Sequence, residues 1–111
     1  KEDEKPLIYG DGEQTRDFTH VSDVVDACLK AAEADLGCET INVGTGRATT
    51  FNQIVELLNQ ELGKSIKPEH VENPIPNYVH HTQADITKAR ELLDYEPSVS
   101  LEEGIKMLRI N

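Results

Sequence analysis

The sequence predicts a small mixed α/β domain with short strands and about four helices. Short β-prone runs alternate with amphipathic helical stretches, and the connections between them are short. Two residue pairs, Thr50 with Gln53 and Ser100 with Glu103, have the spacing of a capping box that starts a helix. The 111 residues are enough for one compact domain and too few for two. We therefore expect residues 1–111 to form a single domain.

The first third of the chain predicts two strands and a helix. A β-prone run at 7–9 is followed by two glycines within 10–12, which favour a turn. Polar and apolar residues alternate over 16–21, which predicts a second strand, and Ser22 can then cap a helix. This helix should end near Gly37. We expect its apolar face to pack on the sheet; that face carries Val21, Val25, Cys28, Leu29 and Ala32.

The middle of the chain predicts a third strand and the best-defined helix. Residues 40–43 are β-prone and lead directly into the glycine-containing loop 44–46. The helix that follows is expected to begin at the capping box of Thr50 and Gln53 and to end at Gly63. Its apolar stripe comprises Phe51, Ile54, Val55, Leu58 and Leu62.

The last third predicts one more strand and two short helices. The run 66–71 is expected to be a strand, and the prolines in 73–77 exclude helix there. Asp85 can cap a short helix that must end before Pro97. The final helix should begin at the second capping box, with its inner face formed by Leu101, Ile105 and Leu108.

The composition excludes several classes of function. With 11 basic and 21 acidic side chains, the net charge of −10 disfavours binding to nucleic acid and to anionic membranes. No apolar run is long enough to span a bilayer, and the two cysteines lack ligand spacing, so we expect a soluble cytoplasmic protein. The charged opening at 1–5 is no secretory leader and suggests a chain cut from a longer one.

Metal and hydrolase chemistry have little support. His80 and His81 are adjacent, so in a strand they point to opposite faces and do not readily hold one metal ion. Cys28 lies on an apolar helical face, where a thiol usually acts as a small hydrophobe. The sequence contains no Gly-x-Ser-x-Gly elbow.

Two glycine pairs and one arginine are candidates for anion binding. The segments 10–12 and 44–46 lack the third glycine of a dinucleotide fingerprint, so neither predicts a nicotinamide site. Both fit ordinary turns, although the second could offer backbone N–H groups to an anion. Arg16 suits bidentate phosphate binding, and an ion pair with Asp17 or Asp11 is the alternative.

Four ordered blocks resemble the extended short-chain dehydrogenase/reductase family, also known as the NAD-dependent epimerase/dehydratase family. The longest block is residues 8–25, Ile-Tyr-Gly-Asp-Gly-Glu-Gln-Thr-Arg-Asp-Phe-Thr-His-Val-Ser-Asp-Val-Val. The others are residues 42–46, residues 82–85 with Lys88 and Ala89, and residues 93–97 leading to 101–105. The resemblance covers nearly the whole chain and is strongest to UDP-glucose 4-epimerases.

This resemblance implies the carboxyl-terminal, substrate-binding part of such an enzyme. In the family, an amino-terminal Rossmann domain carries the NAD fingerprint and a Tyr-x-x-x-Lys pair. Neither is present here, because Tyr9, Tyr78 and Tyr95 all lack a lysine four residues later. The resemblance therefore implies a UDP-sugar-binding lobe that is inactive alone, with NAD held by the missing Rossmann domain. A dehydratase or reductase lobe and a stand-alone binding module are the alternatives.

The resemblance also implies a substrate site. The segment 7–9 matches the strand that lies along the uracil and ribose, and Arg16 matches the arginine that grips the diphosphate. Phe51 matches an apolar position beside the nucleotide. Two positions depart from the pattern: Tyr78 replaces an aspartate that bonds the ribose, and Ile75 replaces a second phosphate-binding arginine. The implied substrate-binding residues are Leu7, Tyr9, Arg16, Phe51 and Tyr78.

Overall fold

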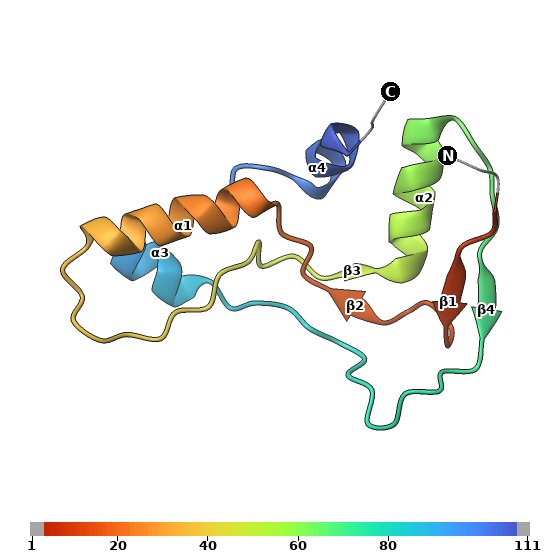
Figure 1. The fold of residues 1–111 in the computed structure, drawn as a ribbon, viewed down its shortest axis with the longest axis horizontal. Helices are drawn as coiled ribbons and strands as arrows, with labels where there is room; N and C mark the ends of the chain where they lie inside the picture. Colours follow the sequence, from red (N-terminus) through yellow and green to blue (C-terminus); the bar gives the residue numbers. More distant parts are fainter. Residues whose placement is uncertain (1–3, 109–111) are drawn as a thin grey trace.

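The computed structural model describes residues 4–108 and has the predicted mixed α/β class, with short strands and four helices in that range (Figure 1). The strands form two separate pairs. β1 and β4 are parallel, and β2 and β3 are antiparallel. The elements are β1 (Leu7–Tyr9), β2 (Thr15–Arg16), α1 (Val21–Glu33), β3 (Thr49–Thr50), α2 (Phe51–Leu62), β4 (Glu69–Val71), α3 (Thr87–Leu93) and α4 (Leu101–Met107).

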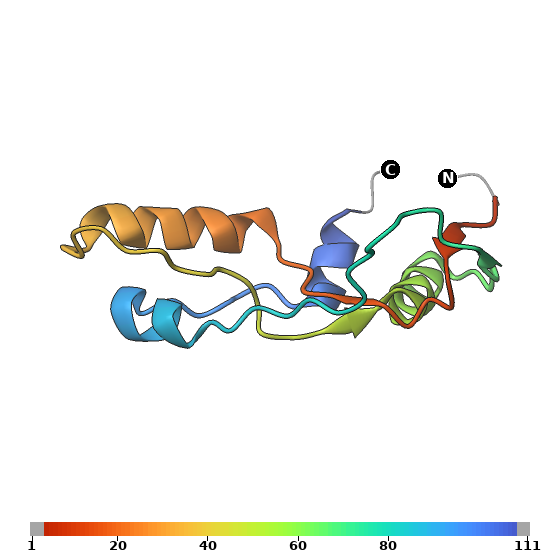
Figure 2. The ribbon, with the colours of Figure 1, turned by 90° about the horizontal axis from the view of Figure 1, so that it is seen from below.

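The molecule is a thin slab, as the edge-on view in Figure 2 shows. It measures 49 × 37 × 16 Å, and its radius of gyration is 16.7 Å, where about 13 Å is expected for a globular domain of this length. Its accessible surface is 7900 Å², against about 6,100 Å² for a compact monomer of this mass. The chain therefore exposes much more surface than a self-sufficient domain does.

Two ends of the slab are joined by β2 and β3 (Figure 1). At one end α1 packs on α3, and a small core forms around the fully buried Tyr95. At the other end the β1–β4 pair lies beside α2, which also contacts α4. The predicted substrate residues belong to the second end and to the connecting strands. The buried cluster at the first end is Ala27, Ile86, Ala89, Leu93 and Tyr95.

The predicted helix caps are confirmed at α2 and partly at α4. Thr50 accepts from the backbone N–H of Gln53, whose side chain accepts from Thr50 in return, and Gly63 ends α2 with φ 64°. The Ser100 hydroxyl oxygen accepts from the N–H of Glu103. The Glu103 carboxylate accepts from the Ser100 hydroxyl and not from the Ser100 backbone N–H. These contacts are local, which is why the sequence predicts them well.

Two other caps differ from the prediction. α1 begins at Val21, and its cap is His20, whose Nδ1 accepts from the N–H of Ser22, so Ser22 is not the cap. Asp85 does accept from the N–H of Thr87, as a capping residue would, but α3 starts one residue later than its side chain suggests. An imidazole nitrogen can replace a serine oxygen because both accept a hydrogen bond.

The strand predictions were too long where no neighbouring strand lies alongside. Of the second predicted strand, 16–21, only Arg16 is strand, since β2 begins one residue earlier at Thr15 and residues 17–20 are irregular. Residues 40–43 form no strand among the described residues, because none of the described strands pairs with them. The run 66–71 is strand only at Glu69–Val71, where β1 supplies its partner. Backbone pairing, more than propensity, decides these limits.

The predicted packing of the α1 apolar face was wrong. Val21, Val25 and Leu29 are 68%, 51% and 60% exposed, and Cys28 is exposed as well. The buried residues of α1 are instead Asp23 and Ala27, on the side that meets α3. The two strand pairs are too short to cover the helix. An apolar ridge formed by Val21, Val25 and Leu29, called here the α1 ridge, is consequently left in contact with solvent.

Candidate functional site

Arg16 is held at the end of β2 by backbone carbonyls. Its Nη1 donates to the carbonyl of Thr15 at 2.6 Å and makes a longer contact to that of His80 at 3.5 Å, while Nη2 donates to Val79 at 2.7 Å. Among the described residues, no ion pair joins Arg16 to Asp11 or Asp17. The ion-pair alternative from the sequence therefore has no support, and no carboxylate within residues 4–108 neutralises the charge of the guanidinium.

Two aromatic rings lie against the same guanidinium. Its central carbon is 5.2 Å from the ring centroid of Tyr78 and 5.8 Å from that of Phe51. These distances are in the range of cation–π interactions. The structure thus brings together three of the five predicted substrate residues, Arg16, Phe51 and Tyr78. Arg16 and Tyr78 are 62 positions apart in the chain.

Local structure explains why these rings reach Arg16. Phe51 is the first residue of α2, and its N–H donates to the carbonyl of Gln14, one position before β2. The segment that carries Tyr78 runs beside β2, with Thr15 paired to His81. Asn77, just before it, has φ 54°, a left-handed conformation that asparagine tolerates better than most residues. Three chain segments therefore meet at Arg16.

Leu7 and Tyr9 lie on one face of β1. Ile8 between them is buried, while Leu7 is 58% and Tyr9 39% exposed, as alternation along a strand requires. Tyr9 is linked to the Arg16 cluster through buried Gln14, whose side-chain amide donates to the Tyr9 carbonyl at 2.8 Å and to the Tyr78 hydroxyl at 3.4 Å. Leu7 has no described contact with Arg16.

Asp17, directly after β2, has a structural role that the sequence did not predict. Its two carboxylate oxygens accept from the N–H groups of Thr45, Gly46 and Ala84 and from the Thr45 hydroxyl. Burial of the carboxyl raises its pKa, but these hydrogen bonds outweigh that effect, and the net pKa lies below the usual value. The only signal in the sequence is an acid directly after Arg16, which does not identify its partners.

The loop 44–46 is therefore no open anion site. The N–H groups of Thr45 and Gly46 that could have met a ligand already bind the carboxylate of Asp17. A Cβ on Gly44 would lie 2.7 Å from Asp17 Oδ2 and 2.6 Å from the Ala84 side chain, so glycine is needed there. The hydroxyl of buried Tyr95 donates to the Gly44 carbonyl at 2.7 Å, and burial raises its pKa. The loop is structural.

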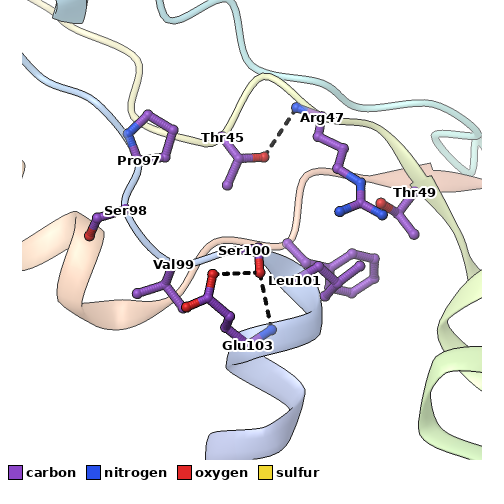
Figure 3. A pocket seen from close by; sticks show the side chains of 10 residues that line it. Thr45, Arg47, Thr49, Pro97, Ser98, Val99, Ser100, Leu101 and Glu103 are labelled. Atoms are coloured by element: carbon purple, nitrogen blue, oxygen red, sulfur yellow. Dashed lines mark hydrogen bonds between the residues drawn. The ribbon is translucent and has the colours of Figure 1, made fainter. Parts of the chain in front are cut away.

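A pocket of about 280 Å³ with both polar and apolar lining residues lies next to this loop, between it and the start of α4 (Figure 3). Its mouth carries Arg47, which makes a bidentate ion pair with Glu102 at 2.8 and 3.0 Å. This pairing lowers the pKa of Glu102 to about 2. Because Arg47 already has a carboxylate partner, this pocket is less suited to binding an anion than the site at Arg16.

The described residues contain neither a helix that could span a membrane nor a cluster of metal ligands. Within residues 4–108, no helix combines the length and apolar character that crossing a membrane requires. The described histidine, cysteine and acidic side chains do not gather into groups of three or more that could hold a metal ion. His80 contacts Tyr78 edge-on at 5.5 Å, and His81 Nδ1 lies 3.2 Å from the Thr15 hydroxyl.

Sequence comparison identifies the family. The sequence profile of the GDP-mannose 4,6 dehydratase family matches residues 1–108. The chain belongs to this family. Among curated relatives, the UDP-glucuronate 4-epimerase of Thermodesulfobacterium geofontis is 44% identical over 106 residues, which are 94% of this chain and 32% of that protein. This family member thus spans about a third of the length of that relative.

Solved structures of epimerases have the same fold over this region. The UDP-glucose 4-epimerase of Thermotoga maritima, solved with UDP-glucose, matches with a TM-score of 0.87 and 44% identity over 95% of this chain and 33% of that one. The UDP-glucuronic acid 4-epimerase of Bacillus cereus, solved with UDP-glucuronic acid and NAD, has a TM-score of 0.87 and 36% identity over 94% and 33%. The resemblance to UDP-sugar epimerases predicted from the sequence is confirmed.

Proposed function

We propose that this chain is the UDP-sugar-binding lobe of an NAD-dependent sugar-nucleotide 4-epimerase. The observation that carries the proposal is the cluster at Arg16, where an arginine with no carboxylate partner among the described residues contacts two aromatic rings. An uncompensated guanidinium is suited to a diphosphate, because Arg N–H groups match phosphate oxygens. The two similar solved epimerases hold a UDP-sugar, which supports the same class of ligand here.

The nucleoside would lie on the exposed face of β1. Leu7 and Tyr9 present neighbouring apolar surface there, and Gln14 joins this face to Tyr78 and so to the phosphate end. Phe51 borders the same region from α2. This arrangement places an apolar surface and a positive charge side by side, which is the combination that a base followed by a diphosphate requires.

A Rossmann domain is the proposed partner of this lobe. The α1 ridge is exposed, and residues 40–43 are β-prone but unpaired within the described chain. The surface excess of about 1,800 Å² over a compact monomer is of the size that one large interface would cover. A sheet-containing domain could pair with 40–43 through backbone hydrogen bonds and cover α1, so both features fit one partner.

NAD is proposed to bind to that partner and not to this lobe. The residues here do not fit the dinucleotide, since the sequence has no three-glycine fingerprint and the N–H groups of Thr45 and Gly46 are taken by Asp17. No Tyr-x-x-x-Lys pair exists to move a proton. We therefore propose that the lobe binds and orients the sugar nucleotide and is inactive alone. We also propose a cytoplasmic enzyme, as unpaired Cys28 and Cys38 suit a reducing compartment.

A dehydratase or reductase lobe is the second candidate, and the matching family profile, named for a dehydratase, favours it. A full-length enzyme in which this chain forms the carboxyl-terminal third would separate the two. It should interconvert 4-epimers of UDP-glucose or UDP-glucuronic acid without net oxidation. Formation of a 4-keto-6-deoxy sugar would indicate the dehydratase instead. Failure to bind any UDP-sugar would overturn the proposal and favour a binding module of another kind.

A further inference from the structure

Tyr78 stands out because it contacts Arg16 without neutralising it. Arg16 has five N–H bonds, and those of Nη1 and one of Nη2 point at the carbonyls of Thr15, His80 and Val79. The Nε–H and the second N–H of Nη2 have no partner among the described residues. Carbonyls and an aromatic face both attract a cation, but neither carries a negative charge to cancel it.

The Tyr78 ring is itself held in place. Its hydroxyl accepts a hydrogen bond from Gln14, which is only 4% exposed, and the His80 ring packs against it edge-on with centroids 5.5 Å apart. Asn77 turns the backbone into a left-handed conformation immediately before it. These three constraints fix the ring under the guanidinium, while Val79, the next residue, is 56% exposed and contributes to Arg16 only its carbonyl.

We propose that Tyr78 is a positioning residue for Arg16. Its ring holds the guanidinium against the carbonyls of β2 and residues 79–80, so that the remaining N–H bonds face a ligand phosphate with their full charge. A carboxylate at position 78 would hold the arginine equally well, but it would compete with the phosphate. This inference rests on the proposed UDP-sugar site and names the residue that prepares Arg16 for the diphosphate.

The test compares UDP with uridine, which lacks the phosphates. Calorimetric titrations would use a full-length enzyme in which this chain forms the carboxyl-terminal third, with the variants Tyr78→Leu, Tyr78→Met and Tyr78→Phe. The two aliphatic variants should bind UDP about three- to tenfold more weakly, the range that loss of a cation–π contact implies, with uridine binding unchanged. Tyr78→Phe should remain close to the wild type, because it keeps the ring.

Val79→Ala is the matched control, since it alters the neighbouring side chain and leaves the carbonyl that accepts from Arg16. Equal UDP affinity in the wild type and the aliphatic variants would overturn the inference. An equal loss for UDP and uridine would do so too, because it would mean direct contact with the nucleoside. If the two aliphatic variants fail to fold, Tyr78→Phe provides the test. Loss of UDP binding in this variant would show that the aromatic ring alone does not position Arg16. A wild type that binds no UDP would instead overturn the proposed function itself.

Discussion

The carboxylate of Asp17 receives both the backbone N–H and the hydroxyl of Thr45, 28 positions away along the chain. Together with Gly46 and Ala84, this contact ties the end of β2 to two other segments. Arg16 is the adjacent residue on β2, so the same tie also fixes the backbone from which the guanidinium extends. Arg16, the proposed phosphate-binding residue, and Asp17, which supports it, are thus consecutive residues whose side chains contact different segments of the chain.

Replacing Asp17 with asparagine should destabilise the fold. The amide would direct an NH₂ group at N–H donors that now meet an oxygen, leaving at least one of them without an acceptor. We expect a loss of about 1–3 kcal/mol in the free energy of unfolding, measured by urea titration of the full-length enzyme. Asp11→Asn is the control, because among the described residues the carboxylate of exposed Asp11 accepts only from the N–H of Glu13. Equal losses in both variants would contradict the structural role of Asp17.

The same carboxylate predicts acid sensitivity. The native pKa values of Asp17 and of buried Asp23 lie below their usual values, since hydrogen bonds from Thr45 and Ser98 outweigh the opposing effect of burial. Each group therefore stabilises the fold above about pH 4, the pKa in the unfolded chain, and this stabilisation is lost as the pH falls through the lower native pKa. Stability should thus decrease with falling pH, and Asp17→Asn should show a shallower decrease. Identical slopes would refute this.

The isolated 111-residue chain should show no epimerase or dehydratase turnover, even with NAD supplied. It has neither a dinucleotide fingerprint to hold the hydride acceptor nor the Tyr-x-x-x-Lys pair that the family uses for proton transfer. The measurement is conversion of UDP-glucose to UDP-galactose, followed by chromatography. Sustained turnover by the purified chain would show that the catalytic groups have been misjudged.

The isolated chain should also be only marginally stable and should self-associate through the α1 ridge. Leu29→Lys places a charge at one end of that ridge, where Leu29 is 60% exposed, and should shift the chain toward monomer in sedimentation velocity. Gln60→Lys adds the same charge on the exposed side of α2 and should have little effect. A wild-type chain that is monomeric with a sharp, concentration-independent melting transition would count against the prediction.

Arg16→Ala should weaken UDP binding by the full-length enzyme by about 1.5–3 kcal/mol, the usual range for a hydrogen bond to a charged group. UDP-sugars should lose as much as UDP, because the diphosphate is common to both, so KM should rise more than kcat falls. Lysine at this position should restore only part of the affinity, since an ammonium lacks the planar fork. Unchanged dissociation constants by calorimetry would exclude the phosphate contact.

Local signals in the sequence were sufficient for α2, but they placed the end of α1 near Gly37 where the structure ends it at Glu33. The boundaries of α2 follow from Thr50, Gln53 and Gly63, all within one turn of the helix ends. The strand expected at 40–43 and the buried face expected for α1 were both wrong, because no described strand pairs with 40–43 and no described element covers that face of α1. Amphipathic periodicity shows that a face is apolar, but it does not identify what covers that face.

The candidate site could be predicted only through family resemblance. Composition and spacing left Arg16 undecided between a phosphate and an ion pair, and the structure removes the support for the ion pair. The meeting of Tyr78 with Arg16 depends on the left-handed turn at Asn77 and on the pairing of Thr15 with His81. Contacts across more than sixty residues leave no periodic pattern in a single sequence.

The separation of the slab into two ends has a consequence for how the enzyme would unfold. No pair of described elements with substantial contact joins the α1–α3 end to the β1–β4 end, and the chain passes between the two ends through β2 and Asp17. If the α1 ridge and residues 40–43 complete the sheet of another domain, the Tyr95 core would open cooperatively with that domain. The β1–β4 end would then unfold independently of that domain. The boundary between cooperative units would pass through this chain at β2, beside the arginine proposed to hold the ligand.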